Sequence, residues 1–163
     1  MIKVISAVDI AECVTVIQES FYTVAKEFGI TVENAPRFTA FATTEERLHF
    51  QMEEEHRPMY AYFEKGKILG YYSLAMLDDS KCELNNLCVL PSHRHKGIGE
   101  QLLKHAFTTA VTLHCTKMQI GIVEENEVLK QWYAAKGFIH TGTQKFDFFP
   151  FTCGYMEKTL KTV

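Results

Sequence analysis

The sequence predicts an α/β fold in which a central mixed, mostly antiparallel sheet is flanked by helices. Strand-like runs cluster between residues 59 and 90, a long amphipathic helical pattern follows at 98–113, and another strand pattern comes directly after it. If the strands on either side of that helix are neighbours, they form a parallel pair with a right-handed crossover. The runs that are joined by short turns can pair antiparallel.

The first part of the chain is predicted to form a short strand and two helices. Residues 2–6 are rich in β-forming side chains. Apolar residues then recur at alternating spacings of four and three over 10–28, which predicts an amphipathic helix closed by Gly29. Residues 30–43 have the composition of an irregular loop, and 44–55 are predicted to form a second, more acidic helix.

The rest of the chain alternates between strand and helix patterns, separated by turn residues. The element order is therefore β-α-α-β-β-β-α-β-α-β-β. The expected strands are 59–63, 68–77, 83–90, 118–123, 138–146 and 153–160, and the expected helices are 98–113 and 126–136.

The composition indicates one globular domain, and we expect it to include residues 1–163. Hydrophobic residues make up 47% of the chain, which is enough for a sizeable core. A net charge of −3 gives no support to a nucleic-acid partner, and no apolar run is long enough to cross a membrane. The five cysteines form no Cys-x-x-Cys pair and the N-terminus lacks a signal-peptide pattern, so we expect a cytoplasmic monomer or homodimer.

A basic, glycine-containing loop joins the strand that ends before Pro91 to the long helix. Glycine lets the backbone turn tightly and approach a ligand, and the helix start offers unpaired N–H groups. Basic side chains beside a helix N-terminus favour an anion, and phosphate above all. The alternative is a solvated basic turn. The loop consists of Arg94, His95, Lys96, Gly97, Ile98 and Gly99.

Other phosphate-binding and metal-binding motifs do not fit this loop. No Gly-Lys-Ser/Thr follows at P-loop spacing, and Gly97-Ile98-Gly99 lacks the third glycine of the dinucleotide fingerprint. His93 and His95 have no further ligands at a recognisable spacing, so we expect no metal.

The loop 94–99 resembles the Arg/Gln-x-x-Gly-x-Gly/Ala loop of the GNAT superfamily of N-acetyltransferases, which holds the pyrophosphate of acetyl-CoA. The preceding run from Glu83 to Pro91 is also similar to that family, as Glu-Leu-x-x-Leu-x-Val-x-Pro. The element order matches the family's fold along essentially the whole chain. The resemblance implies a GNAT-like acyl-CoA N-acyltransferase fold, acetyl-CoA as co-substrate and transfer of the acetyl group to a primary amine.

A second resemblance to the same family lies in the helix at 126–136. Asn126 and Tyr133 are seven residues apart, about two helical turns, so they project from nearly the same face. With Gly137-Phe138 they resemble the second GNAT motif, in which the Asn contacts the pantetheine region and the Tyr hydroxyl lies near the thioester sulfur. Tyr133 is therefore the candidate general acid. The alternative is an aromatic residue at the boundary of a helix.

Acetyl transfer to an amine needs a base, because an alkylammonium has a pKa near 10. The resemblance places the family's catalytic glutamate, which usually acts through water, at Glu83. The alternative is a surface glutamate. The family's strand bulges and splays from its parallel neighbour, which implies oxyanion donors among the backbone N–H groups of Leu87, Cys88 and Val89. Cys88 as a nucleophile is disfavoured, because no histidine is marked as its base.

The acceptor is the least defined part. Aromatic residues and the acidic run 53–55 are candidate walls of its site, although both are also typical of an ordinary core and a solvated helix face. A small cationic amine, an amino acid, an aminoglycoside-like polyamine or a peptide amine all remain open, as does the acyl length. A non-catalytic acyl-CoA-binding or sensing module is the alternative function. It would keep the loop 94–99 but need neither Glu83 nor Tyr133.

Overall fold

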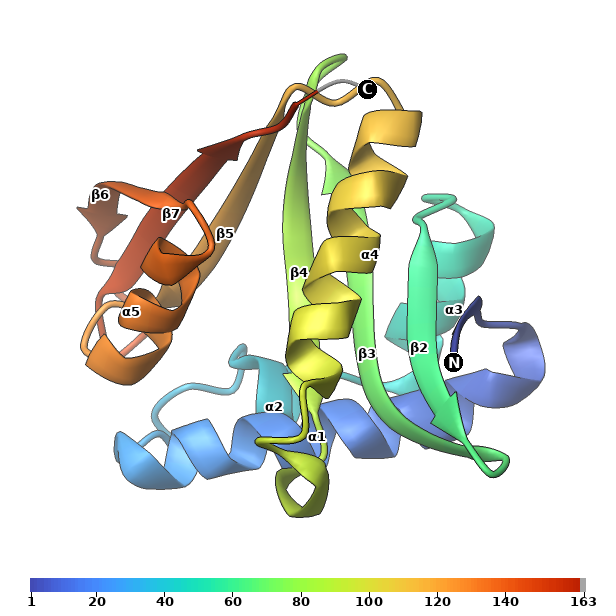
Figure 1. Cartoon of the computed structure of the whole chain (residues 1–163). Coiled ribbons are helices and arrows are strands. Elements are labelled where there is room, and N and C mark those ends of the chain that lie inside the picture. The colour runs from blue at the N-terminus through green and yellow to red at the C-terminus, as the bar shows by residue number, and fades with distance from the viewer. Residues whose placement is uncertain (162–163) are drawn as a thin grey trace.

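A seven-stranded sheet forms the centre of the computed structural model, which describes residues 1–161 (Figure 1). The strand order across the sheet is β1-β2-β3-β4-β5-β7-β6. Neighbouring strands are antiparallel except β4 and β5, which run parallel, so the predicted mixed sheet is confirmed. The strands are β1 (Ile2–Val4), β2 (Met59–Glu64), β3 (Lys67–Met76), β4 (Lys81–Val89), β5 (Lys117–Val123), β6 (Ile139–Gln144) and β7 (Cys153–Thr159).

The helices follow the predicted order. Within residues 1–161, the α-helices are α1 (Ile10–Glu27), α2 (Thr39–Ala42), α3 (Glu45–Glu53), α4 (Ile98–Thr112) and α5 (Glu127–Ala135). Short 3-10 turns at Ala7–Asp9 and Pro91–His93 precede α1 and α4. In this part of the chain, no helix has the length and apolar content needed to cross a membrane.

The short helix α2 lies in the segment that was expected to be an irregular loop. It follows Phe38, whose ring packs edge-on against Phe151 with their centroids 5.6 Å apart. Phe38 is buried in a small cluster that also includes Val123 of β5. Both contacts come from distant parts of the chain, so the local pattern of residues gave no sign of this turn.

Two hydrophobic cores lie on opposite faces of the sheet. One core contains the apolar stripe of α4, with Leu102 and Ala106 fully buried. The other contains the stripe of α1, including Ile10 and Ile17, together with Leu48 of α3. Figure 1 shows α4 along one face of β3 and β4, and α1 crossing the other.

A β-bulge interrupts β4 near its middle. The register with β3 shifts by one residue, so that Asn86 and Leu87 together oppose Tyr72. Asn86 adopts φ of +55°, a left-handed conformation that asparagine tolerates better than most residues. The bulge that the family resemblance implied is therefore confirmed.

The bulge reverses the faces to which β4 side chains point. Before it, Cys82 and Leu84 belong to the core on the α4 face. After it, Cys88 belongs to the core on the α1 face, and Leu87 and Val89 pack against the α4 core. Side chains of a strand alternate between the two faces of the sheet, so one extra residue at the bulge reverses the face to which all following side chains point.

The parallel strands β4 and β5 form a fork. They are paired over only three positions, from Lys81 with Lys117 to Glu83 with Gln119. Beyond these positions the strands diverge towards the N-terminus of α4, as Figure 1 shows. We call the paired positions the closed half of the fork and the rest of β4, from Leu84 to Val89, its open half. The expected splay of this strand from its parallel neighbour is confirmed.

Candidate active site

Glu83 lies where the two strands of the fork separate. It occupies the last paired position of β4, opposite Gln119 of β5. The Gln119 side chain donates a hydrogen bond from Nε2 to Glu83 Oε2 over 2.9 Å. The carboxylate is half-buried, and this bond holds it at the start of the open half.

Asn85 links Glu83 to an arginine from the segment after α3. In the orientation of the Asn85 amide that satisfies both neighbours, its nitrogen donates to Glu83 Oε1 over 2.8 Å. Its oxygen accepts from Arg57 Nη1 over 3.1 Å. The Arg57 guanidinium also donates to Glu55 Oε2 from Nη2 at 3.0 Å. Both oxygens of the Glu83 carboxylate therefore accept a hydrogen bond from an amide, and its orientation is fixed.

The backbone of the open half directs N–H groups to both sides of β4. The Leu90 N–H donates to the Leu69 carbonyl of β3 over 2.8 Å. Successive residues of a strand direct their N–H groups to opposite sides. The N–H of Cys88 therefore also points towards β3, and the N–H groups of Leu87 and Val89 point towards the opening between β4 and β5. The oxyanion role of Leu87, Cys88 and Val89 stays a prediction.

Most backbone N–H groups of the loop 94–99 have no partner among residues 1–161; the exception is Arg94, whose N–H donates to the Pro91 carbonyl over 3.4 Å. His95 and Gly97 both adopt left-handed conformations, with φ of +62° and +83°, and Gly97 caps α4. No group among residues 1–161 accepts a hydrogen bond from the N–H of any residue from 95 to 100. These donors lie at the positive end of the α4 dipole, an arrangement that fits a phosphate group.

The side chain of Arg94, which we expected among the anion-binding groups, is hydrogen-bonded to two backbone carbonyls. Its Nε donates to the Val89 carbonyl over 3.2 Å, and its Nη2 donates to the Ser20 carbonyl of α1 over 3.0 Å. Arg94 therefore fixes the loop to β4 and α1, while the side chains of His95 and Lys96 are exposed. The sequence pattern of the loop predicted anion binding, but it did not predict that Arg94 fixes the loop to β4 and α1.

Tyr133 reaches from α5 towards β4. Its ring packs edge-on against Phe138, with centroids 5.3 Å apart, and the side chain is 6% exposed. Burial raises the pKa of the Tyr133 hydroxyl above its usual range, and the nearby Cys88 adds to this effect. The hydroxyl consequently stays protonated at physiological pH. No hydrogen bond to any of residues 1–161 engages it.

Cys88 lies beneath the fork on the α1 face. Burial raises the pKa of the Cys88 thiol to about 12. A thiol needs a lowered pKa to act as a nucleophile at neutral pH, so this environment opposes that role.

Asn126 has a structural contact that the sequence could have indicated. It is the N-cap of α5, and its Oδ1 accepts from the Leu129 N–H over 3.2 Å. Asparagine just before an amphipathic helix is a typical N-cap signal. The cap occupies one of the two lone pairs of Oδ1, and the side-chain nitrogen of Asn126 makes no hydrogen bond within residues 1–161.

Comparison with known proteins now identifies the family. The profile of the Acetyltransferase (GNAT) family matches residues 20–138, which include the fork, the loop 94–99 and all of α5. This chain belongs to the GNAT family. The membership implied by the loop 94–99 is thereby confirmed.

Curated relatives also bear acetyltransferase names. An uncharacterized N-acetyltransferase of Mycobacterium tuberculosis is 31% identical over 81 residues, covering 50% of this chain and 52% of the relative. The chain thus spans about half the length of the first curated relatives it matches. An uncharacterized N-acetyltransferase of Lactobacillus delbrueckii is 24% identical and covers 82% of this chain and 80% of its own.

Solved structures share the fold over nearly the whole chain. The PaiA N-acetyltransferase of Thermoplasma acidophilum, crystallised with coenzyme A, superposes with a TM-score of 0.81 at 21% identity, covering 98% of both chains. The ribosomal-protein-S18-alanine N-acetyltransferase of Escherichia coli gives a TM-score of 0.77 at 14% identity, with coverage of 100% of this chain and 95% of that one. These likenesses establish the fold.

Two residues near Glu83 were not predicted as part of the site. Gln119 faces Glu83 across the fork, and Arg57 reaches it through Asn85. Gln119 could have been found by aligning the two parallel strands, since both lie in expected strands. Arg57 carries no local motif, and only the packing of the segment after α3 brings it to β4.

Proposed function

We propose that this chain is an N-acetyltransferase that moves the acetyl group of acetyl-CoA to a primary amine by direct attack in a ternary complex. The observation that carries the proposal is the arrangement of the fork. A fixed carboxylate lies where the strands separate, and a loop of unpaired N–H groups lies beyond the open end. We take the described fold to act as one catalytic domain.

The cofactor half of the site rests on the loop and the fork. The N–H groups of residues 95–100 would hold the pyrophosphate of acetyl-CoA, since they are bare and lie at a helix N-terminus. In the open half, the backbone groups of β4 that do not pair with β5 would form hydrogen bonds with the pantetheine arm, which takes the place of a neighbouring strand. When bound, acetyl-CoA supplies the acetyl group as a thioester.

The chain's own groups match the proton and charge movements of the reaction. Glu83 would accept the proton of the acceptor ammonium, directly or through water. The Leu87 and Val89 N–H groups would donate to the carbonyl oxygen as it gains negative charge. The Tyr133 hydroxyl would donate to the departing sulfur. Because its raised pKa makes it a weak acid, its main effect is a hydrogen bond to the developing thiolate.

Two measurements on the purified protein test this function. Thermal unfolding is followed with acetyl-CoA and CoA, and with ATP as control. A ligand at about a hundred times its dissociation constant adds roughly 2.7 kcal/mol, which is several degrees for a chain of this size. Release of free CoA thiol is then followed with a panel of amines.

The outcomes separate the enzyme from a sensing module. Stabilisation by acetyl-CoA and CoA but not by ATP, with amine-dependent thiol release, supports the proposal. Stabilisation without transfer to any amine would favour a non-catalytic acyl-CoA-binding module. No stabilisation by acetyl-CoA or CoA would leave the loop 94–99 as a solvated basic turn.

A further inference from the structure

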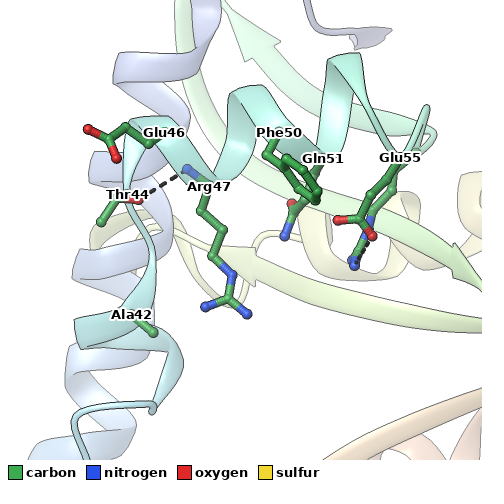
Figure 2. A pocket seen from close by; sticks show the side chains of 8 residues that line it. Ala42, Thr44, Glu46, Arg47, Phe50, Gln51 and Glu55 are labelled. Atoms are coloured by element: carbon green, nitrogen blue, oxygen red, sulfur yellow. Dashed lines mark hydrogen bonds and ion pairs between the residues drawn. The ribbon is translucent and has the colours of Figure 1, made fainter.

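An open pocket lies under α3, on the same face of the sheet as Glu83. Its volume is about 520 Å³, within the range of small-molecule sites. We call it the α3 pocket (Figure 2). Its walls come from the end of α2, from α3 and from the segment before β2. The lining residues are Ala42, Thr44, Glu46, Arg47, Phe50, Gln51, Glu55 and Arg57.

Two hydrogen-bond donors on α3 face this pocket without partners. Arg47 and Gln51 are four residues apart, and Figure 2 shows their side chains extending to the same side of the helix. The Arg47 guanidinium forms no hydrogen bond or ion pair with residues 1–161. Gln51 is 6% exposed, yet its amide makes no hydrogen bond in that part of the chain, and its Oε1 is buried without a partner.

The buried Oε1 of Gln51 is an acceptor and would not bond to a carboxylate, whereas the side-chain nitrogen of Gln51 has no partner among residues 1–161 and can donate to a ligand in the pocket. The side-chain nitrogen of Gln51 and the Arg47 guanidinium are both donors, and an ionised carboxylate accepts from both. Of the carboxylates of the pocket, Glu55 is engaged by Arg57, and Figure 2 shows Glu46 pointing away from Arg47. The exposed ring of Phe50 adds an apolar surface for an aliphatic portion.

The α3 pocket is connected to the proposed base. Arg57 lines the pocket and donates to Asn85, which donates to Glu83. The cationic wall is thus two hydrogen bonds from the carboxylate that would receive the amine proton.

We propose that the α3 pocket binds a carboxylate of the acceptor, so that the acceptor is a small amine that carries a carboxylate, such as an amino acid. This inference rests on the proposed acetyltransferase function. It selects one of the acceptor classes that the sequence left open. Arg47 binds the carboxylate, Gln51 donates beside it, and Glu83 receives the amine.

The first test compares acetylation of the common L-amino acids with that of their C-terminal amides. We expect higher kcat/KM for one or more acids than for the matching amide. Arg47→Gln should lower kcat/KM for that acid by about 10- to 100-fold, the loss of a charge-assisted hydrogen bond, and leave the amide unchanged. Lys104→Gln removes the same charge from an exposed position on α4 and serves as control. Equal rates for acids and amides, or no effect of Arg47→Gln, would overturn the inference.

A binding measurement separates this inference from the proposed function. The side-chain amide signals of Gln51 are followed by ¹H–¹⁵N NMR, with and without CoA, as the same acids and amides are added. Acids should shift these signals, amides should not, and Arg47→Gln should abolish the effect. If acids shift them while no amine is acetylated, the acetyltransferase function fails and the carboxylate site stands. If no acid shifts them, the carboxylate site is wrong, whatever the protein acetylates.

Discussion

The two halves of the fork differ in whether the parallel strands β4 and β5 are paired. In the closed half, β4 and β5 are paired, and Glu157 of β7 bridges them through Lys81 and Lys117, with N–O distances of 2.6 and 3.5 Å. In the open half β4 stays paired with β3 but not with β5, a bulge interrupts it, and the N–H groups of Leu87 and Val89 face the opening. The polar groups of the closed half stabilise the fold, and we propose that those of the open half bind a ligand.

This difference suggests that the residues that stabilise the fold and the residues that act in catalysis lie in different halves of the fork. Changes in the closed half should alter the free energy of unfolding and leave the kinetics intact. Changes around the open half should alter the kinetics and leave folding nearly intact. Glu83, at the boundary, tests the division most directly.

Replacing Glu83 with Gln should have the largest effect. Loss of a general base lowers kcat by about 10²- to 10³-fold at neutral pH. Without the base, the rate should rise between about pH 7 and pH 10, as more of the acceptor is already neutral. The measurement is the pH profile of kcat/KM, and circular dichroism controls for folding. A variant with an unchanged rate and profile would remove Glu83 from the base role.

Replacing Tyr133 with Phe should lower kcat by about 10²-fold, because it removes the proposed donor to the sulfur. The dissociation constant of acetyl-CoA should stay the same, since the ring remains. The raised pKa of Tyr133 also predicts that deprotonation of its hydroxyl causes no fall in the wild-type rate below pH 10. Calorimetric titration with acetyl-CoA and steady-state kinetics check these points. Weaker cofactor binding with full kcat would mean that the hydroxyl only positions the cofactor.

Replacing Gly99 with Ala should weaken acetyl-CoA binding about tenfold, equivalent to about 1.4 kcal/mol. The new Cβ would lie 3.7 Å from Val89 Cγ2 and 3.9 Å from Trp132 Cζ2, which are ordinary contacts. The protein itself therefore tolerates alanine, and helix propensity favours it by up to about 1 kcal/mol. We expect an unchanged or higher Tm together with weaker binding. Gly142→Ala, in open space on β6, is the control. Unchanged affinity in Gly99→Ala would show that no ligand approaches this backbone.

Replacing Glu157 with Gln should have the smallest effect and touch only stability. The hydrogen bond from Lys81 lowers the pKa of Glu157, so its contribution is present above the ordinary carboxylate pKa and is lost as pH falls through the folded-state pKa. We expect a loss of about 0.5–1 kcal/mol at neutral pH and a smaller loss at about pH 3. Urea unfolding at both pH values measures this. A large change in kcat would contradict the division between the halves.

Much of the fold could be predicted because its patterns are local. The stripes of α1 and α4 and the turns of the β2–β4 meander depend on spacings that a short stretch of sequence displays. The turn at α2 could not be predicted, because it depends on Phe38 meeting Phe151.

The candidate site was predictable where a loop or helix carries its own motif. The loop 94–99 and the helix with Tyr133 are such cases. The bracing bonds of Arg94 and the link from Arg57 through Asn85 were not predictable, since each joins segments that only folding brings together. The α3 pocket has no motif at all, and Gln51 stands out only once its burial is known.

The bulge at Asn86 has a consequence for how this protein could be redesigned. Because side chains change faces at the bulge, Glu83 and Asn85 lie on the α1 face of the sheet, where the proposed acceptor site lies, while Leu87 and Val89 lie on the α4 face. In the proposed enzyme, acceptor and thioester recognition would thus depend on two consecutive segments of one strand. Swapping the segment before Asn86, together with α3, from another member of the family should exchange acceptors and leave thioester recognition untouched.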